Sequence, residues 1–211
     1  ALYFGNRLVQ FPLGVFGAAL STAIFPTLAS TARDRDYAGL TAALRQALRV
    51  TAFIALPATA LAVALRTPIV ELMFRRGDFD HTSASRTAWV LVFYCLGLMP
   101  FFANQVVTRV FYSFEDTRTP VIVSTAMVGL NFALNITLVW FLRESGLALS
   151  TSVTAFVNLG LLVWLLRRRL GAVCGREVVV STCKSLAASA ACGAVAWGVF
   201  AAMGRGGLLV R

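Results

Sequence analysis

The chain alternates between long apolar runs and short polar segments that carry arginine. Six runs are long enough to cross a bilayer, whose hydrocarbon core of roughly 30 Å needs about 20 apolar residues in a helix. The runs fall at about residues 1 to 28, 47 to 65, 87 to 112, 119 to 142, 146 to 166 and 178 to 203. This pattern predicts an all-α fold, a polytopic membrane helix bundle with six transmembrane helices.

The composition supports a membrane protein. Of the 211 residues, 58% are hydrophobic and only 13% are charged, with a mean hydropathy of +0.77. A soluble domain of this size does not bury so much apolar surface. The chain begins at Ala1, already inside the first apolar run. We therefore expect it to be part of a larger, transporter-sized protein.

The arginines between the runs predict which way the chain crosses the membrane. Alternate loops fall on the same side, and one side holds nine loop arginines, including the dense run Arg167 to Arg169, against seven at most on the other. Because cytoplasmic loops carry an excess of Lys and Arg, this side is predicted to be cytoplasmic. The net charge of +10 is then explained by topology and lipid headgroups, and no nucleic-acid partner is expected.

Groups that support catalysis are scarce in this sequence. The four cysteines show no paired spacing for a disulfide framework or a metal site. His81 lies beside Asp80 and Ser83, but catalytic triads seldom come from neighbours in sequence. The carboxylates lie in loops or at the ends of runs, which leaves no intramembrane acid for a proton relay. We expect that the protein is not an enzyme.

Arg7 is the charged residue that the apolar pattern does not explain. It lies inside the first run, and Pro12, Gly14 and Gly17 follow it, so the helix is expected to bend and to open a wet cavity beneath the arginine. An intramembrane arginine costs about 2.5 to 3.5 kcal/mol on insertion scales, which suggests a partner or a substrate. Its guanidinium suits phosphate oxygens. The alternative is an arginine that snorkels to the headgroups.

Three segments carry a resemblance to a known family. They read NRLVQFPLGVFGAALSTAIFPTL at residues 6–28, FYSFEDTRTPV at residues 111–121 and GLALSTSV at residues 146–153. In this order they resemble the MurJ (MviN) family of lipid II flippases, which belongs to the multidrug/oligosaccharidyl-lipid/polysaccharide exporter superfamily. A single short match is weak, whereas three matches along nearly the whole chain are specific.

The resemblance implies a fold and a function. It implies two lobes that work by alternating access, with residues 1–170 forming most of the second lobe. Residues 171–211 then form the first helix of a C-terminal hydrophobic groove and a truncated loop. The implied activity is flipping of lipid II from the cytoplasmic to the outer leaflet of the bacterial inner membrane, by a monomer that contacts only this substrate and membrane lipids. The alternative is a related exporter of drugs or of other polyprenyl-diphosphate-linked oligosaccharides.

The resemblance also implies a substrate-binding group. Arg7 falls on the family's essential cavity arginine, which implies contact with the diphosphate of the lipid-linked precursor. Asn6 and Gln10 stand where other members carry acids, so Arg7 is expected to be freer to bind an anion. Asn104, which follows Pro100, either lines the same cavity or satisfies carbonyls that the proline leaves free.

A second polar group suggests an ion site. In family members that bind sodium, the ion lies between two helices that here correspond to the fourth and fifth runs. The resemblance makes Asn131, Asn135, the Leu147 carbonyl and Thr151 candidate ligands, and hard cations prefer such oxygens. The alternative is that these polar residues hydrogen-bond between the two helices. No other cofactor is expected.

Overall fold

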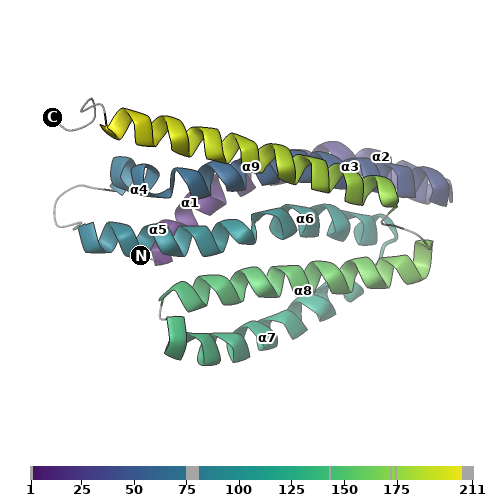
Figure 1. The fold of residues 1–211 in the computed structure, drawn as a ribbon. Coiled ribbons are helices and arrows are strands. Elements are labelled where there is room, and N and C mark those ends of the chain that lie inside the picture. Colours follow the sequence, from purple (N-terminus) through teal and green to yellow (C-terminus); the bar gives the residue numbers. More distant parts are fainter. Residues whose placement is uncertain (1, 75–80, 143, 172, 174, 206–211) are drawn as a thin grey trace.

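The computed structural model describes residues 2–74, 81–142, 144–171, 173 and 175–205, and most of these residues are helical. The elements follow one another along the chain with short connections (Figure 1). They are α1 Leu2–Pro12, the π-helix η1 Leu13–Gly17, α2 Ala18–Arg33, α3 Tyr37–Ala64, α4 Arg66–Phe74, α5 His81–Leu96, α6 Leu98–Ser113, α7 Arg118–Leu142, α8 Glu144–Leu170 and α9 Arg176–Arg205.

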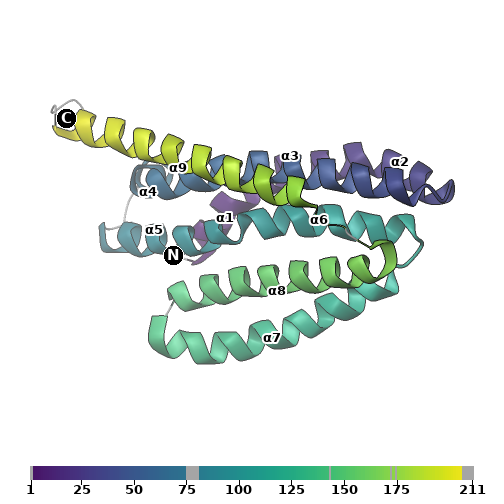
Figure 2. The ribbon, with the colours of Figure 1, turned by 45° about the vertical axis from the view of Figure 1, so that its right-hand side comes forward.

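Five helical segments in the described residues are long and apolar enough to cross a membrane. They are Tyr37–Ala64, Ser85–Ser113, Arg118–Leu142, Glu144–Leu170 and Arg176–Ala202. These five segments overlap the second to the sixth predicted runs. They run side by side as an elongated bundle (Figure 2), and the prediction of an all-α, polytopic membrane protein is confirmed.

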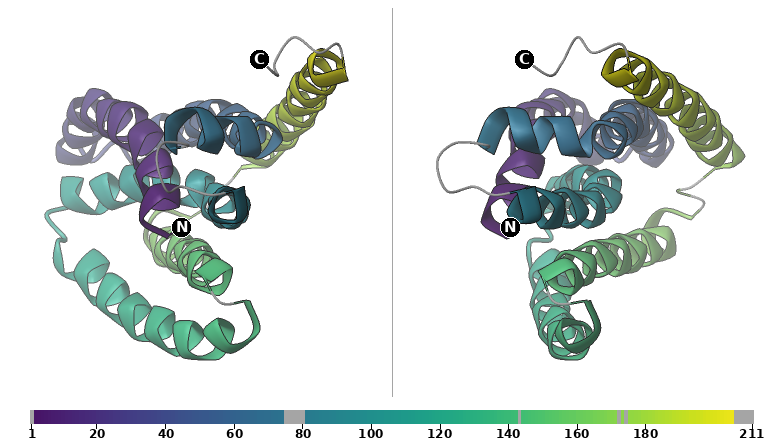
Figure 3. Two further views of the ribbon diagram at one scale, coloured as in Figure 1. Left: turned by 90° about the vertical axis from the view of Figure 1, so that its left-hand side faces the viewer. Right: turned by 60° about the vertical axis from the view of Figure 1, so that its left-hand side comes forward.

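The first apolar run is helical but not continuous. α1 ends at Pro12, a five-residue π-helix follows, and α2 continues to Arg33. Proline lacks an amide hydrogen and its ring crowds the preceding turn, so the regular hydrogen-bond ladder is interrupted there. α1 therefore crosses the bundle obliquely instead of continuing along α2 (Figure 3). The expected bend beside Pro12 is confirmed.

Close packing against α6 holds this irregular turn in place. A Cβ atom added to Gly17 would lie 3.0 Å from the Gln105 side chain and 3.1 Å from the Phe102 ring. A side chain at this position would require the α6 side chains to move by a few tenths of an ångström, so glycine suits the close approach of the π-helical turn to α6. The third run is also divided, because α5 ends at Leu96 and α6 begins after Gly97.

Two clusters of buried side chains hold the helices together. One joins α2, α3, α6 and α8 with the first turns of α7 and α9, through residues such as Leu44, Phe111 and Leu166. The other joins α1, α3, α4, α5 and α6 and includes Val9 and Leu91. Apart from these buried positions, α7 and α9 leave many large apolar side chains exposed, as helices that face lipid do.

One end of the bundle carries most of the described arginines. The turns α2–α3, α6–α7 and α8–α9 lie together there (Figure 1). We call this the arginine-rich end, and its residues include Arg33, Arg35, Arg118, Arg167, Arg168, Arg169 and Arg176.

α9 packs along α3 after the chain turns at Gly171, where φ is +78°. A Cβ atom on Gly193 would lie 3.2 Å from the Ala60 carbonyl, and Arg49 and Glu177 form an ion pair at 3.8 Å. The predicted segments 1–170 and 171–211 therefore share an interface. Their assignment to a lobe and a groove stays a prediction.

Candidate functional site

Arg7 lies on the outer face of α1, where its side chain is exposed. One guanidinium nitrogen donates a hydrogen bond to the Tyr3 hydroxyl at 3.0 Å. The guanidinium carbon also lies 5.3 Å from the centre of the Tyr3 ring. Both contacts follow from the spacing of four residues, which places the two side chains next to each other on a helix.

The neighbours of Arg7 leave it available to an anion. Asn6 and Gln10 are exposed on α1, on either side of Arg7 in the sequence. The opposite face of α1 packs on α5, where Gly5 lies against Val90 and Val9 is buried. Tyr3 occupies one of the five N–H donors of the guanidinium, and the others suit the oxygens of a phosphate.

Asn104 lies apart from this group. It lines a cavity of about 360 Å³ between α6, α7 and α8, and its amide nitrogen donates to the Ala155 carbonyl at 3.1 Å. Its side-chain oxygen and that of Asn158 are both buried without a hydrogen-bond partner among the described residues. The structure thus brings Asn104 together with the polar residues of α7 and α8, including Asn131 and Thr151.

The candidate sodium ligands lie together between α7 and α8. Asn135 donates to the Asn131 side-chain oxygen at 2.9 Å, and Asn131 donates to the Thr154 hydroxyl at 3.3 Å. The Ser150 hydroxyl donates to the Asn135 side-chain oxygen. The Thr151 hydroxyl donates to the Leu147 carbonyl at 2.9 Å. These contacts form a continuous hydrogen-bonded chain across the two helices.

The hydrogen-bonded group between α7 and α8 offers a hard cation the right type of ligand, but it has no negative charge. Side-chain and backbone oxygens are the ligands that such ions take. The side-chain oxygens of Asn131 and Asn135 each accept one hydrogen bond and keep a second lone pair. The Leu147 carbonyl, in contrast, already accepts from both the Ser150 and the Thr151 hydroxyls. In the described part of the chain no three His, Cys, Asp or Glu side chains gather as a metal cluster.

Two features of this region were not predicted from the sequence. Tyr3 is the partner of Arg7, and its spacing of four residues could have indicated it. The unpaired oxygen of Asn158 could not be predicted, because it depends on how α6 packs against α8. His81 begins α5, and its side chain lies outside the described part of the structure.

The fold and these polar groups within it define a multi-pass membrane protein of helical-bundle type. Its long helices are apolar outside, and α6, α7 and α8 enclose polar side chains. The model of the family described as lipid II flippase MurJ matches residues 1–209, so the chain belongs to this family of transporters.

Relatives from several bacteria carry the description probable lipid II flippase MurJ. The protein of Vibrio cholerae is 34% identical over 161 residues, which is 76% of this chain and 31% of the relative. The protein of Rhizobium meliloti is 35% identical over 158 residues, which is 75% of this chain and 30% of the relative. The chain therefore spans about a third of the length of these relatives.

A solved structure of similar fold supports the architecture. It is described as lipid II flippase MurJ in an inward closed conformation, and the TM-score is 0.72. The match covers 99% of this chain and 47% of the solved chain, with 21% sequence identity. At this identity the likeness establishes the fold alone.

Proposed function

We propose that this chain forms the second lobe of a flippase that moves lipid II from the cytoplasmic to the outer leaflet of the bacterial inner membrane. The observation that carries the proposal is the match of the lipid II flippase family over residues 1–209. The chain spans about a third of its relatives, so the activity belongs to a longer protein in which this lobe faces another.

In this function Arg7 binds the diphosphate of the substrate. A charged side chain among membrane helices is favourable only when water or an opposite charge faces it. Tyr3 holds the guanidinium on the exposed face of α1, and Asn6 and Gln10 add polar groups without negative charge. An exposed guanidinium that has no ion pair with any described residue is well suited, in a lobe of a two-lobed transporter, to line the cavity between the lobes.

Alternating access requires that the substrate be bound and then released. An arginine with donors free for phosphate binds the diphosphate in one state and loses it when the cavity opens to the other leaflet. The apolar outer surfaces of α7 and α9 keep the lobe in lipid while this cavity changes. We propose a monomer as the working unit, since alternating access needs only the two lobes of one chain.

Growth complementation tests this function directly. The full-length protein replaces the native flippase of a bacterium that depends on it, and it carries Arg7→Ala or Arg7→Lys. We expect Arg7→Ala to abolish growth and Arg7→Lys to support it poorly, because lysine keeps the charge and loses the planar fork. Full growth with both variants would contradict the proposed role of Arg7.

The matched control is Arg66→Ala. The Arg66 guanidinium also stacks on an aromatic ring, at 5.0 Å from the centre of the Trp89 ring. It lies on α4 and outside the candidate site. Growth should be retained in this variant, which separates loss of a specific arginine from loss of a stacked cation.

We also propose that a sodium ion binds at Asn131, Asn135, Thr151 and the Leu147 carbonyl. The four oxygens lie together, which supports the proposal. Asn135→Ala should then reduce the sodium dependence of transport by the full-length protein in vesicles. Transport that is the same in sodium and in choline buffers would leave only hydrogen bonding between α7 and α8 as the role of this group.

A further inference from the structure

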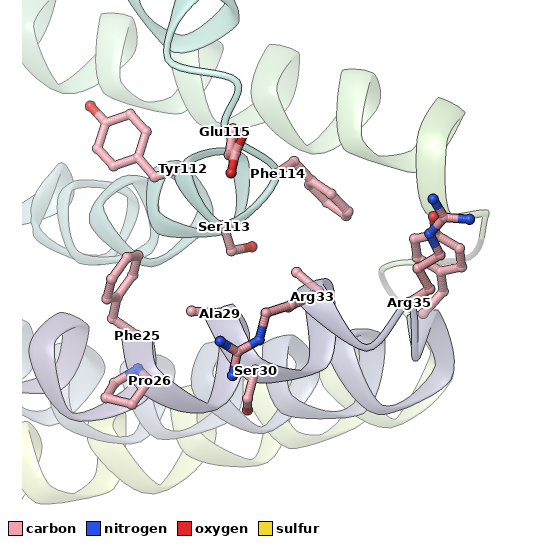
Figure 4. A pocket seen from close by; sticks show the side chains of 12 residues that line it. Phe25, Pro26, Ala29, Ser30, Arg33, Arg35, Tyr112, Ser113, Phe114 and Glu115 are labelled. Atoms are coloured by element: carbon pink, nitrogen blue, oxygen red, sulfur yellow. The ribbon is translucent and has the colours of Figure 1, made fainter.

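A second cavity lies at the arginine-rich end of the bundle. It has a volume of about 570 Å³, is open on one side, and is bordered by the end of α2, the start of α3 and the end of α6. Figure 4 shows Arg33 along the wall formed by α2, Arg35 at the turn after it, and Glu115 on the side of α6. This volume is typical of sites that hold a small organic ligand.

Two cations in the cavity lack a counter-charge. Neither the Arg33 nor the Arg35 guanidinium makes an ion pair or a hydrogen bond with any residue in the described ranges. Arg109 adds a third positive charge close by, since its guanidinium lies 5.6 Å from the ring centre of Phe25, which lines the cavity. Glu115 is the acid on the lining, so positive charge dominates.

Two charged residues on the lining, Arg35 and Glu115, have a left-handed backbone conformation, which glycine adopts most easily. Arg35 follows the end of α2 with φ +57°, in the left-handed region. The Asp36 amide donates to the Thr31 carbonyl at 2.9 Å. The Arg35 amide donates to the Ala32 carbonyl at 3.2 Å, which completes a Schellman motif. α6 ends in the same way, with Glu115 at φ +59°. Such strain is common at functional sites.

The rest of the lining is apolar with hydroxyl groups at its edge. Phe25 and other apolar side chains form the walls, and Tyr37 and Tyr112 are exposed with hydroxyls that can donate to an anion. A soluble anion gains nothing from such walls. A lipid headgroup does, because its phosphate meets the cations while its first carbons meet the aromatic rings.

We propose that this cavity binds the diphosphate of the polyprenyl-linked substrate on the cytoplasmic side, before the substrate reaches Arg7. The inference rests on the proposed function and adds a second binding station to it. Arg33 follows Arg7 by twenty-six positions, a helical path of about 39 Å at roughly 1.5 Å per residue, which the bend after Pro12 makes an upper limit for the direct distance. α1 lies toward the end of the bundle opposite to the arginine-rich end (Figure 1). The two stations therefore serve opposite leaflets, with the arginine-rich end in the cytoplasm.

Binding by the full-length protein in nanodiscs of neutral lipid tests the inference. The Arg7→Ala background isolates the second station, and the probe is undecaprenyl diphosphate. We expect Arg33→Ala to weaken binding about tenfold, as loss of a charge-assisted hydrogen bond does. Arg33→Lys should restore part of the affinity. Glu115→Gln should strengthen binding roughly threefold, because it removes the negative charge on the lining.

The matched control is Arg167→Ala, which removes one positive charge from the same end but not from the cavity. Equal weakening by Arg167→Ala and Arg33→Ala would mean that only surface charge is measured, and would overturn the inference. Equal affinity for phosphatidylglycerol would show a general lipid-phosphate site. Equal affinity for inorganic diphosphate would show a site for soluble anions. Both results would overturn the assignment to the substrate.

Failure of this inference can be distinguished from failure of the proposed function. If the protein with Arg7 intact binds undecaprenyl diphosphate and Arg33→Ala has no effect in the Arg7→Ala background, the second station is wrong and the function stands. If the intact protein neither binds the probe nor complements growth, the proposed function fails, and the second station fails with it.

Discussion

At the scale of single residues, Asp116 connects two elements at the arginine-rich end. Its carboxylate accepts the Thr119 backbone N–H at 2.9 Å and the Thr119 hydroxyl at 2.8 Å, and so caps the start of α7. It also pairs with Arg169 from the end of α8. The hydrogen bond from the Thr119 backbone is the main reason that the pKa of Asp116 lies below its usual value.

This lowered pKa predicts a loss of stability in acid. A carboxylate whose pKa is lower in the folded state stabilises the fold above its unfolded pKa of about 3.9. The contribution is lost as the pH falls through the folded pKa. Thermal unfolding in detergent should therefore show stability falling below about pH 4. Asp116→Asn should be less stable at neutral pH and should lose less in acid, and a parallel loss in both proteins would contradict this.

The sequence predicts those contacts of the site whose two residues lie close together along the chain, and it does not predict contacts between distant segments. Asn131 and Asn135 lie one helical turn apart, so the sequence places them on one face, and Arg7 and Tyr3 obey the same spacing. The position of Asn104 beside α8 depends on packing between distant segments, which spacing does not report. The sequence indicates only that Arg35 is a charged residue in a loop. Its left-handed backbone conformation is known from the structure alone.

At the scale of elements, the α7–α8 hairpin depends on a close approach at its closed end. A Cβ atom on Gly146 would overlap the carbonyl of Leu138, so α8 leaves the turn directly against the backbone of α7. The hydrogen-bonded chain from Asn131 to Ser150 begins beside this contact. The geometry of the candidate ion site therefore depends on a residue without a side chain.

Gly146→Ala should separate the two helices and destabilise the protein by roughly 1 to 3 kcal/mol, as overpacking does. The control is Gly160→Ala in the same helix, where no atom lies within 4 Å of the added Cβ. Alanine there should be neutral or slightly stabilising, because it favours helix. Thermal unfolding followed by tryptophan fluorescence measures both variants, and equal stability of the two would show that the approach is not tight.

The sequence predicts the long elements better than their interruptions. Apolar periodicity and length are local properties, so all the predicted runs lie on helices. The bend after Pro12 could also be predicted, because proline removes a donor. The break at Gly97 has a local cause as well, because Pro100 has no amide hydrogen to donate to the Leu96 carbonyl, where α5 ends. Only the contact of Gly97 with α8, where an added Cβ would crowd the Ser152 side chain, depends on packing between distant segments.

At the scale of the whole molecule, both proposals depend on how the bundle sits in the membrane. The turns at the arginine-rich end hold the cavity lined by Arg33 and Arg35 (Figure 4). The opposite end holds α4 and the start of α5 (Figure 1). The excess of arginine favours the first end as the cytoplasmic one.

Labelling of single cysteines measures this orientation. In a cysteine-free full-length protein, Ser85→Cys and Thr117→Cys place one thiol at each end, both at exposed positions. A membrane-impermeant maleimide should label Ser85→Cys in intact spheroplasts and Thr117→Cys only after permeabilisation. The reverse pattern would invert the topology and would remove the cavity from the side where the substrate begins.

The π-helical turn Leu13–Gly17 determines the direction in which Arg7 points relative to α2. A π-helical turn closes its hydrogen bonds from i to i+5 and so holds more residues per turn than an α-helix, and together with Pro12 it sets the direction in which α1 leaves α2. Deletion of Gly14 should remove the extra residue from this turn, change the direction of α1 and of the guanidinium that it carries, and abolish complementation while the protein still inserts. Gly14→Ala adds a Cβ that meets no atom within 4 Å, so this variant should keep both the orientation of Arg7 and the activity.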